Sequence, residues 1–310
     1  MKRVGLLLLV LALAGLGWVW TPDKPRAELE ALYAGPASEF SSVLGLRVHL
    51  RDSAPHDTSG RPVVLMLHGF GGSLHSFEAW AAGLAATHRV IRIDLPGAGL
   101  TGADPSGDYS DERGIAVLAA LLNQRGVARA TVLGHSMGGR LAWRFAAAQP
   151  ERVDELVLVA PDGFASPGFD YGKAPKVGVV AKLMTVALPK AVLRMSLAPA
   201  YAQPDAVMDD ALVTRYHDLM LAPGVRPAII ARMEQLNLLP PEPLLRAIRA
   251  PTLLLWGEQD GMIPIANAQD YLKALPNAKL VTLPGVGHVP QEEAAAAGLA
   301  ALQAFLGATP

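Results

Sequence analysis

The chain of 310 residues contains no cysteine. This absence excludes disulfide bonds, thiolate catalysis and cysteine-ligated zinc or iron–sulfur centres. It also leaves the redox compartment open, because a cysteine-free chain tolerates an oxidising or a reducing one. The sequence has no surplus of either charge, since 27 Lys and Arg stand against 28 Asp and Glu. Binding to nucleic acid is therefore not predicted.

The sequence also lacks the patterns of metal and dinucleotide sites. Its eight histidines are scattered, with no His-Glu-x-x-His motif and no close pair on a helix face. Residues 97–102 match Gly-x-Gly-x-x-Gly, but Asp104-Pro105-Ser106-Gly107 prevents the helix that this pattern requires. We therefore expect no metal and no cofactor.

A long apolar run is present at the N-terminus, over residues 4–20, and Lys2 and Arg3 precede it. A helix of this length would measure about 26 Å, enough to span a hydrocarbon core of about 30 Å with local thinning. The two cations favour a cytoplasmic N-terminus, and Trp18 and Trp20 suit the far interface. The sequence predicts a transmembrane anchor over residues 1–20 of an inner membrane, with the folded part on the periplasmic side.

A cleaved signal peptide is the alternative to this anchor. Residues 12–14, Ala-Leu-Ala, have the small-x-small pattern of a cleavage site. Cleavage there would start the mature, secreted chain at Gly15, with residues 15–20 still apolar. Both interpretations place the folded part outside the cytoplasm.

The remaining chain is predicted to form an α/β domain with an inserted cap. Apolar strands alternate with helical segments over residues 41–162 and 250–310. This alternation is typical of a doubly wound, mostly parallel sheet with helices on both faces. The alternation stops over residues 163–249, where Met, Leu, Ala and Pro predict short helices that form a cap and partly line a pocket. Residues 21–40, with three prolines and mixed charges, are predicted to be a tether.

The stretch around Ser136 has the pattern of a strand, a tight turn and a helix. Residues 130–133 are mostly apolar, and residues 140–149 are amphipathic. Gly134 and Gly138 flank the serine, as expected where a tight turn strains the central residue and larger neighbours would collide. The turn exposes the hydroxyl and directs the first N–H groups of the helix at it. Ser136 is therefore a candidate nucleophile.

A serine nucleophile needs a base, and the base needs an orienting acid. Asp260 and His288 each follow a later predicted strand, so both are expected at the same edge of the sheet as Ser136. Glu258 and Asp162 are alternative acids.

Five motifs carry a resemblance to a known family. They are His68-Gly69-Phe70-Gly71-Gly72, Asp94-Leu95-Pro96-Gly97-Ala98-Gly99, Gly134 to Gly139, Gly257-Glu258-Gln259-Asp260 and Gly287-His288. In this order they resemble the lid-bearing α/β-hydrolases of the serine esterase and C–C hydrolase branch. The resemblance implies Ser136 as nucleophile, His288 as general base and Asp260 as the acid. It also implies an oxyanion hole made by the backbone N–H groups of Phe70 and Met137.

Three other polar residues near these motifs are given structural roles. We expect His68 to order the oxyanion loop through hydrogen bonds. His135 is expected to pack beside the turn, and Asp94 is expected to tie down the Pro96-Gly97 turn through backbone N–H groups.

A serine at this position favours acyl transfer. The leading hypothesis is a serine esterase that cleaves small apolar esters with short to medium acyl groups. The alternative is a C–C bond hydrolase of vinylogous ketoacids, whose dianionic substrate would need cations such as Arg140 or Arg194. A non-catalytic binding module is a third hypothesis. The sequence assigns no substrate-binding residues.

Overall fold

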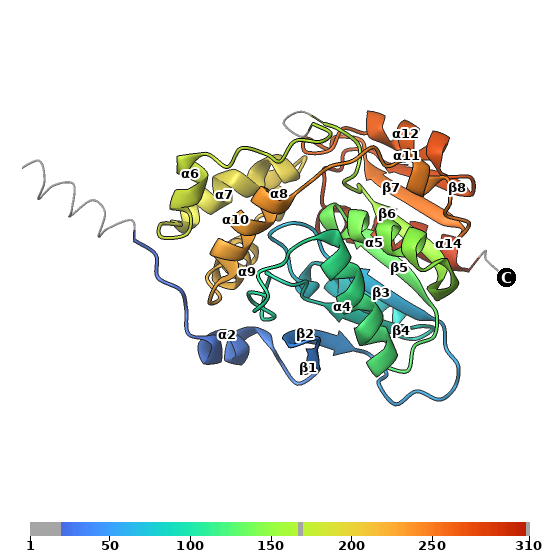
Figure 1. Ribbon diagram of the computed structural model, residues 1–310, viewed down its shortest axis with the longest axis horizontal. Coiled ribbons are helices and arrows are strands. Elements are labelled where there is room, and N and C mark those ends of the chain that lie inside the picture. The colour runs from blue at the N-terminus through green and yellow to red at the C-terminus, as the bar shows by residue number, and fades with distance from the viewer. Residues whose placement is uncertain (1–19, 167–169, 308–310) are drawn as a thin grey trace, which may run out of the picture.

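An eight-stranded sheet forms the centre of the computed structural model, which describes residues 20–166 and 170–307 (Figure 1). The strand order is β1-β2-β4-β3-β5-β6-β7-β8. The strands are β1 Ser38–Val43, β2 Leu46–Asp52, β3 Val63–Leu67, β4 Arg89–Ile93, β5 Ala130–His135, β6 Val153–Val159, β7 Thr252–Gly257 and β8 Ala278–Leu283. The pairs β1–β2 and β2–β4 are antiparallel, and all others are parallel. The predicted α/β class with a doubly wound, mostly parallel sheet is confirmed.

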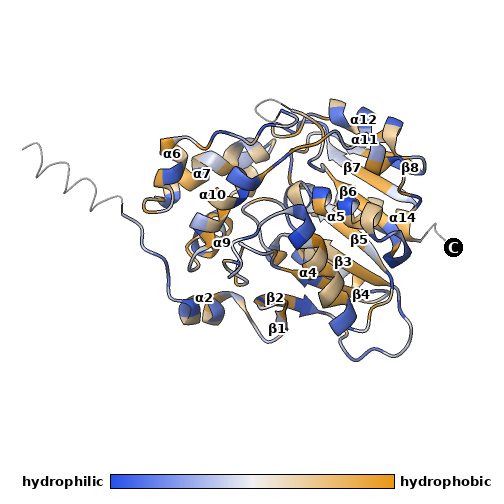
Figure 2. Ribbon diagram, viewed as in Figure 1, coloured by the Kyte–Doolittle hydropathy of each residue, from blue (hydrophilic) through white to orange (hydrophobic). Residues whose placement is uncertain are grey.

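The sheet separates two apolar cores, because successive side chains of a strand point to opposite faces. Leu65 and Leu67 of β3 pack in one core with α4, α5 and α12. Val64 and Met66 pack in the other core with α3 and α14. These helices are α3 Glu78–Leu84, α4 Asp111–Gln124, α5 Met137–Ala148, α12 Ala266–Ala274 and α14 Ala295–Leu306; η1 Leu74–Phe77, η2 Pro150–Arg152 and α13 Pro290–Glu293 are short. The central strands are therefore apolar on both faces (Figure 2).

The strand order reverses between β3 and β5: β4 is added on one side of β3, and β5 on the other. β3 and β5 are neighbours, although β4 lies between them in sequence. The loops that follow their carboxyl ends meet at this switch point, where doubly wound sheets bind their ligands. The loop after β3 begins at His68, and the turn after β5 contains Ser136.

The helices between β6 and β7 form a cap beside the sheet domain (Figure 1). In the described part of this insertion they are α6 Val179–Leu183, α7 Lys190–Leu197, η3 Ala198–Ala200, α8 Pro204–Val207, α9 Asp210–Met220, α10 Val225–Gln235 and α11 Glu242–Leu245. Leu188, Leu193 and Leu219 contribute to an apolar core that belongs to the cap.

The segment predicted as a tether, residues 21–40, differs from that expectation. It contains the helix α2 Arg26–Tyr33 and the first residues of β1. Leu29 of α2 is fully buried in the core of the cap, beside Leu100. Arg26 Nη1 also donates to the carbonyl of Leu100 at 2.7 Å, and the hydroxyl of Tyr33 donates to Asp218 at 2.8 Å. The segment is therefore packed against the domain, and the prolines only precede and follow its helix.

No helix within residues 20–166 and 170–307 is long and apolar enough to cross a membrane. The predicted anchor lies outside the described residues, except for Trp20.

Candidate active site

Ser136 occupies a strained turn between β5 and α5. Its φ is 52° and its ψ is −118°, a conformation that costs a residue with a side chain about 1–3 kcal/mol. A Cβ on Gly134 would lie 2.2 Å from the carbonyl oxygen of Gly138. A Cβ on Gly138 would lie 2.3 Å from the carbonyl oxygen of Leu67. Only glycine fits these two positions, which explains the Gly-x-Ser-x-Gly pattern.

Asp260 is the carboxylate that contacts His288. His288 Nδ1 lies 2.7 Å from Asp260 Oδ2, and both side chains are buried. The other carboxylate oxygen, Oδ1, accepts the N–H groups of Met262 and Ile263, each at 2.8 Å. The loop after β7 therefore holds the carboxylate in place, and the carboxylate sets the tautomer with the proton on Nδ1. The other nitrogen, Nε2, is left as the proton acceptor.

The two alternative acids have other partners. Glu258 Oε1 accepts the hydroxyl of Thr282 at 2.8 Å. Asp162 Oδ2 lies 3.4 Å from Arg140 Nη1. Of the three candidate carboxylates, Asp260 has the geometry of an orienting acid.

Ser136 and His288 line one cavity of about 250 Å³, together with Phe70 and Met137. Met137 is the first residue of α5, so its N–H has no acceptor within the helix. Phe70 lies in a turn closed by a hydrogen bond from the N–H of Gly72 to the carbonyl of Gly69 (3.1 Å). The predicted oxyanion residues therefore lie beside the predicted nucleophile.

Most of the remaining cavity wall was not predicted from the sequence. The residues that line it further are Arg140, Asp162, Ser166, Arg232, Met233, Leu236, Met262 and Ile263. Arg140 was predicted as a possible cation, whereas Arg194 of α7 is not among the lining residues. Of the methionines of the cap, Met233 reaches this cavity, as the prediction of a partly apolar lining requires.

Three of these lining residues are charged, Arg140, Asp162 and Arg232, and burial shifts the pKa of the last two. Burial raises the pKa of Asp162, although Arg140 opposes this effect. Burial lowers the pKa of Arg232 to about 10, and the charge of Arg140 adds to this lowering. Arg232 Nη2 donates to the carbonyl of Pro96 at 2.5 Å, so this cation is held by the backbone of the core. No sequence motif marks Arg232, because α10 reaches the cavity only through the packing of the cap.

His68 and His135 act on the backbone of the site. His68 Nε2 accepts the N–H of Leu95 at 3.0 Å, so its Nδ1–H donates to the carbonyl of Gly69 at 2.7 Å. His135 Nε2–H donates to the carbonyl of His288 at 2.8 Å. His68 thus orders the oxyanion loop as expected, and His135 connects the nucleophile turn to the loop of the base.

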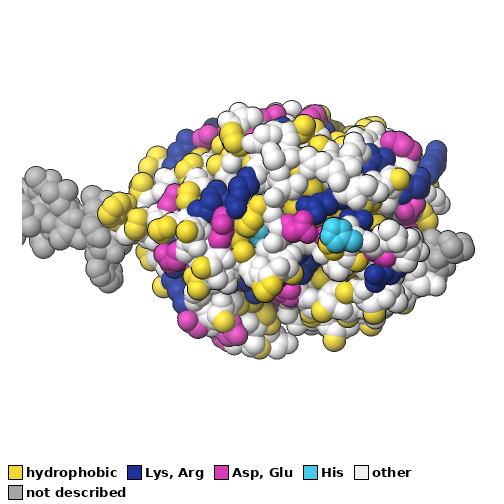
Figure 3. Space-filling view, turned by 90° about the horizontal axis from the view of Figure 1, so that it is seen from below, with side chains coloured by type: hydrophobic (Ala, Val, Ile, Leu, Met, Phe, Trp, Pro, Cys, Tyr) yellow, Lys and Arg dark blue, Asp and Glu magenta, His cyan; other side chains and the backbone are white. Residues whose placement is uncertain are grey.

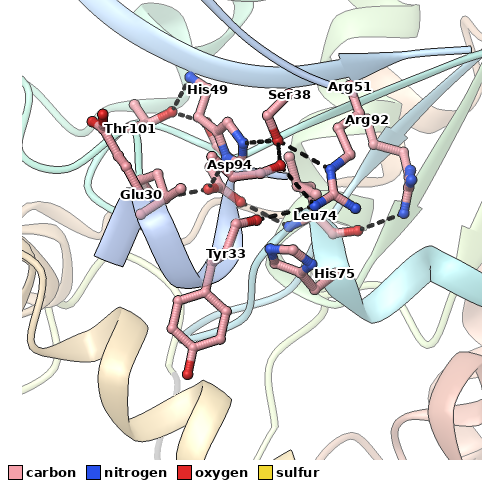
Figure 4. A network of polar contacts seen from close by, with 12 residues as sticks. Glu30, Tyr33, Ser38, His49, Arg51, Leu74, His75, Arg92, Asp94 and Thr101 are labelled. Atoms are coloured by element: carbon pink, nitrogen blue, oxygen red, sulfur yellow. Dashed lines mark hydrogen bonds and ion pairs between the residues drawn. The ribbon is translucent and has the colours of Figure 1, made fainter. Parts of the chain in front are cut away.

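Asp94 lies at the centre of a buried polar network (Figure 4). Its two carboxylate oxygens accept the N–H groups of Leu74 and Leu100, each at 2.8 Å. His49 Nδ1–H donates to Oδ2 at 2.7 Å. Burial would raise the pKa of Asp94, but the hydrogen bond and charge of His49 lower it to about 2. Asp94 therefore fixes the backbone at Leu74 and Leu100, and not the Pro96-Gly97 turn that we expected.

The loop that carries His288 is bound to the cap. The N–H of His288 donates to the carbonyl of Ala200 at 2.7 Å. Glu292 accepts hydrogen bonds from Tyr201 (2.7 Å) and Tyr216 (3.0 Å) and pairs with Arg215 (2.7 Å). The position of the base therefore depends on contacts from η3 to α9.

A family model described as the alpha/beta hydrolase fold matches residues 62–295. The chain therefore belongs to the α/β-hydrolase family.

The chain is similar to several proteins of stated activity. The dihydrolipoyllysine-residue acetyltransferase component of the acetoin cleaving system of Pseudomonas putida is 34% identical over 271 residues, covering 84% of this chain and 67% of the relative. The 2-hydroxy-6-oxononadienedioate/2-hydroxy-6-oxononatrienedioate hydrolase of Cupriavidus pinatubonensis is 28% identical over 298 residues, covering 91% and 99%. Among solved structures, a membrane phospholipase A is 25% identical with a TM-score of 0.72, covering 100% of this chain and 99% of that chain.

Proposed function

We propose that the chain is a serine hydrolase that cleaves carboxylic esters with apolar acyl groups of short to medium length. One observation carries this proposal: Ser136, His288 and the oxyanion residues line a single cavity, and Asp260 contacts His288 Nδ1. Met233, Leu236 and Ile263 supply an apolar wall for the acyl chain.

In the proposed reaction, Ser136 Oγ attacks the ester carbonyl while His288 Nε2 takes the hydroxyl proton. Asp260 stabilises the imidazolium that results. The N–H groups of Phe70 and Met137 donate to the oxyanion of the tetrahedral intermediate, where the loss of one donor costs about 3–4 kcal/mol. His288 then gives its proton to the departing alkoxide, which leaves an acyl group on Ser136. A water molecule, deprotonated by His288, attacks the acyl-enzyme, and His288 then returns the proton to Ser136 Oγ as the acid is released.

A C–C bond hydrolase is the second candidate. The hydrolase of C. pinatubonensis supports it, because that protein is similar to this chain over 99% of its length. The presence of Arg140 in the cavity wall also favours it, since a dianionic ketoacid would need a cation there. A binding module without activity would have no need of the Asp260–His288 pair.

The test is hydrolysis of p-nitrophenyl esters from acetate to palmitate by the wild type, by Ser136→Ala and by the exposed control Ser196→Ala. We expect activity in the wild type and the control and its loss in Ser136→Ala, with the best chain length reporting the size of the cavity. An inert wild type that still reacts at Ser136 with a fluorophosphonate probe would favour the C–C substrates. A folded protein that the probe does not label would support the binding module.

We also propose that residues 1–20 anchor the protein in the inner membrane, with the hydrolase domain on the periplasmic side. The apolar run supports this, and so does the similarity to a membrane phospholipase A along the whole chain. Cell fractionation and N-terminal sequencing test the proposal. We expect the protein in the membrane fraction with its first residues intact; a soluble protein that begins at Gly15 would contradict it.

A further inference from the structure

The cap exposes a group of apolar side chains on α6, on α7 and in the turn between them. They are Val179, Val180, Leu183, Val186, Val192 and Met195, and we call them the cap face. Val180 is 84% exposed and Met195 is 76% exposed. Six exposed apolar residues close together in the sequence are typical of a surface that contacts a membrane or another molecule. Orange in Figure 2 marks the hydrophobic residues of α6.

The first residues that the structure describes lie beside the cap face. The N–H of Thr21 donates to the carbonyl of Val186 at 2.9 Å, and the N–H of Leu188 donates to Thr21 Oγ1 at 3.0 Å. Trp20 is therefore next to the cap face, and it is 64% exposed. Seen from below, hydrophobic side chains are exposed at this end of the molecule, among Lys, Arg, Asp and Glu side chains (Figure 3). An indole at the border of an apolar surface is typical of a membrane interface.

The charges around the cap face are mainly positive. Residues 170–197 contain the five basic residues Lys173, Lys176, Lys182, Lys190 and Arg194, and Asp170 as their one acidic residue. Glu234 pairs with Lys182, and Asp210 pairs with Lys190. Five cations and three carboxylates leave this region with a positive excess of two. Such a region is attracted to anionic headgroups, while lysine stems extend along apolar surface.

We propose that the cap face docks on a bilayer surface that contains anionic lipids. The composition favours a bilayer over a protein partner, because protein interfaces are enriched in aromatic residues and depleted in lysine. The six side chains of the cap face include no aromatic residue, lysines lie near it in the sequence, and the aromatic Trp20 lies at its border. The sequence before Trp20 is apolar and would bring the cap to the same membrane. This proposal concerns a surface outside the catalytic cavity, so it does not depend on the proposed reaction.

The absence of cysteine permits a direct test on the full chain. Single cysteines at Val180→Cys and Met195→Cys would carry a nitroxide spin label, and Leu44→Cys, in the exposed β1–β2 turn, serves as the matched control. Each protein is reconstituted in phosphatidylcholine vesicles with or without about one third phosphatidylglycerol. The measurement is the accessibility of the label to oxygen, which concentrates in the bilayer, and to a water-soluble nickel complex. Thermal unfolding of each labelled protein shows whether it is folded.

We expect labels at positions 180 and 195 to be more accessible to oxygen than to nickel, and more so with phosphatidylglycerol, while the label at position 44 stays aqueous. The double variant Lys176→Glu, Arg194→Glu should reduce this effect in the anionic vesicles. Aqueous labels at 180 and 195 in vesicle-bound protein would overturn the proposal. Labels that are immobilised without lipid would assign the cap face to a protein contact and would overturn it too. Hydrolysis of a soluble p-nitrophenyl ester reports separately on the proposed function.

Discussion

Two buried histidines beside the nucleophile turn make stability depend on pH. Burial lowers the pKa of His68, and burial together with the charge of His288 lowers the pKa of His135 well below its usual value. The unfolded chain binds protons at these residues below about pH 6.5, whereas the folded chain resists them. Their contribution to stability is therefore complete above pH 6.5 and is lost as the pH falls below it.

We predict that the free energy of unfolding falls between pH 7 and pH 5.5. Each histidine that stays neutral in the folded chain lowers the free energy of unfolding by about 1.4 kcal/mol for each pH unit below its unfolded pKa. Urea unfolding across this range measures the slope. His135→Gln should reduce it, and the exposed control His56→Gln should leave it unchanged; equal slopes in both variants would contradict the prediction.

Gly138 is a residue where one methyl group should disrupt the turn. Its Cβ would lie 2.3 Å from the carbonyl oxygen of Leu67 and 2.5 Å from that of His68, and backbone atoms cannot move aside as a side chain can. We predict that Gly138→Ala costs about 3 kcal/mol in the free energy of unfolding, as in other overpacked sites. Gly178→Ala is the control, because nothing lies within 4 Å of its added Cβ. A loss in thermal stability that is no greater for Gly138→Ala than for Gly178→Ala would refute the account of the turn.

Residues in motifs could be predicted from the sequence, and residues brought in by packing could not. The flanking glycines, His288 and Asp260 follow strands in a fixed order, so the sheet places them at one edge. Arg232 lies in the same cavity, but its side chain reaches it through the packing of α10. No local pattern marks such contacts.

At the scale of elements, the contact between the cap and the loop of His288 predicts a positioning role for Glu292. Its carboxylate joins Arg215, Tyr201 and Tyr216 of the cap to α13, which begins two residues after the base. We predict that Glu292→Gln lowers kcat about tenfold, since the neutral amide loses the ion pair with Arg215 and has one acceptor oxygen where the carboxylate has two, so the restraint on the loop weakens.

The pH profile of kcat separates positioning from simple destabilisation. At a temperature where Glu292→Gln is folded, the pH profile of its kcat should shift, because the loop around His288 would be less ordered. Glu234→Gln removes an exposed ion pair with Lys182 in the cap and is the control. An unchanged profile with an unchanged kcat in Glu292→Gln would contradict the positioning role.

The helix α2 shows where element prediction failed. Three prolines in residues 21–40 suggested an extended tether, but Pro25 directly precedes α2, where proline is tolerated. Only Leu29 of this helix is buried.

Leu29 should anchor α2 to the cap. We predict that Leu29→Ala destabilises the protein by about 3 kcal/mol, the usual cost of removing a fully buried leucine side chain. Leu32→Ala, in the same helix but 59% exposed, should cost far less. Urea unfolding measures both, and equal costs would show that α2 is not held by this contact.

At the scale of the whole molecule, the sheet could be predicted because parallel strands buried on both faces are continuous apolar runs. The insertion of the cap was visible as a break in the alternation of strands and helices. The path of the cap helices over the cavity was not visible, because it is set by contacts between residues far apart in sequence, such as Glu292 with Tyr201. Figure 1 shows the result, a sheet domain with a cap beside it and α2 below the cap.

The central claim is that Ser136 forms a covalent acyl-enzyme with an ester. The most direct measurement is mass spectrometry of the protein quenched during turnover of p-nitrophenyl butyrate, followed by peptide mapping. We predict a butyryl group on the peptide that contains Ser136, present in the wild type and absent in Ser136→Ala. Turnover of the ester by the wild type with no adduct on Ser136, or an adduct on a different residue, would contradict the account.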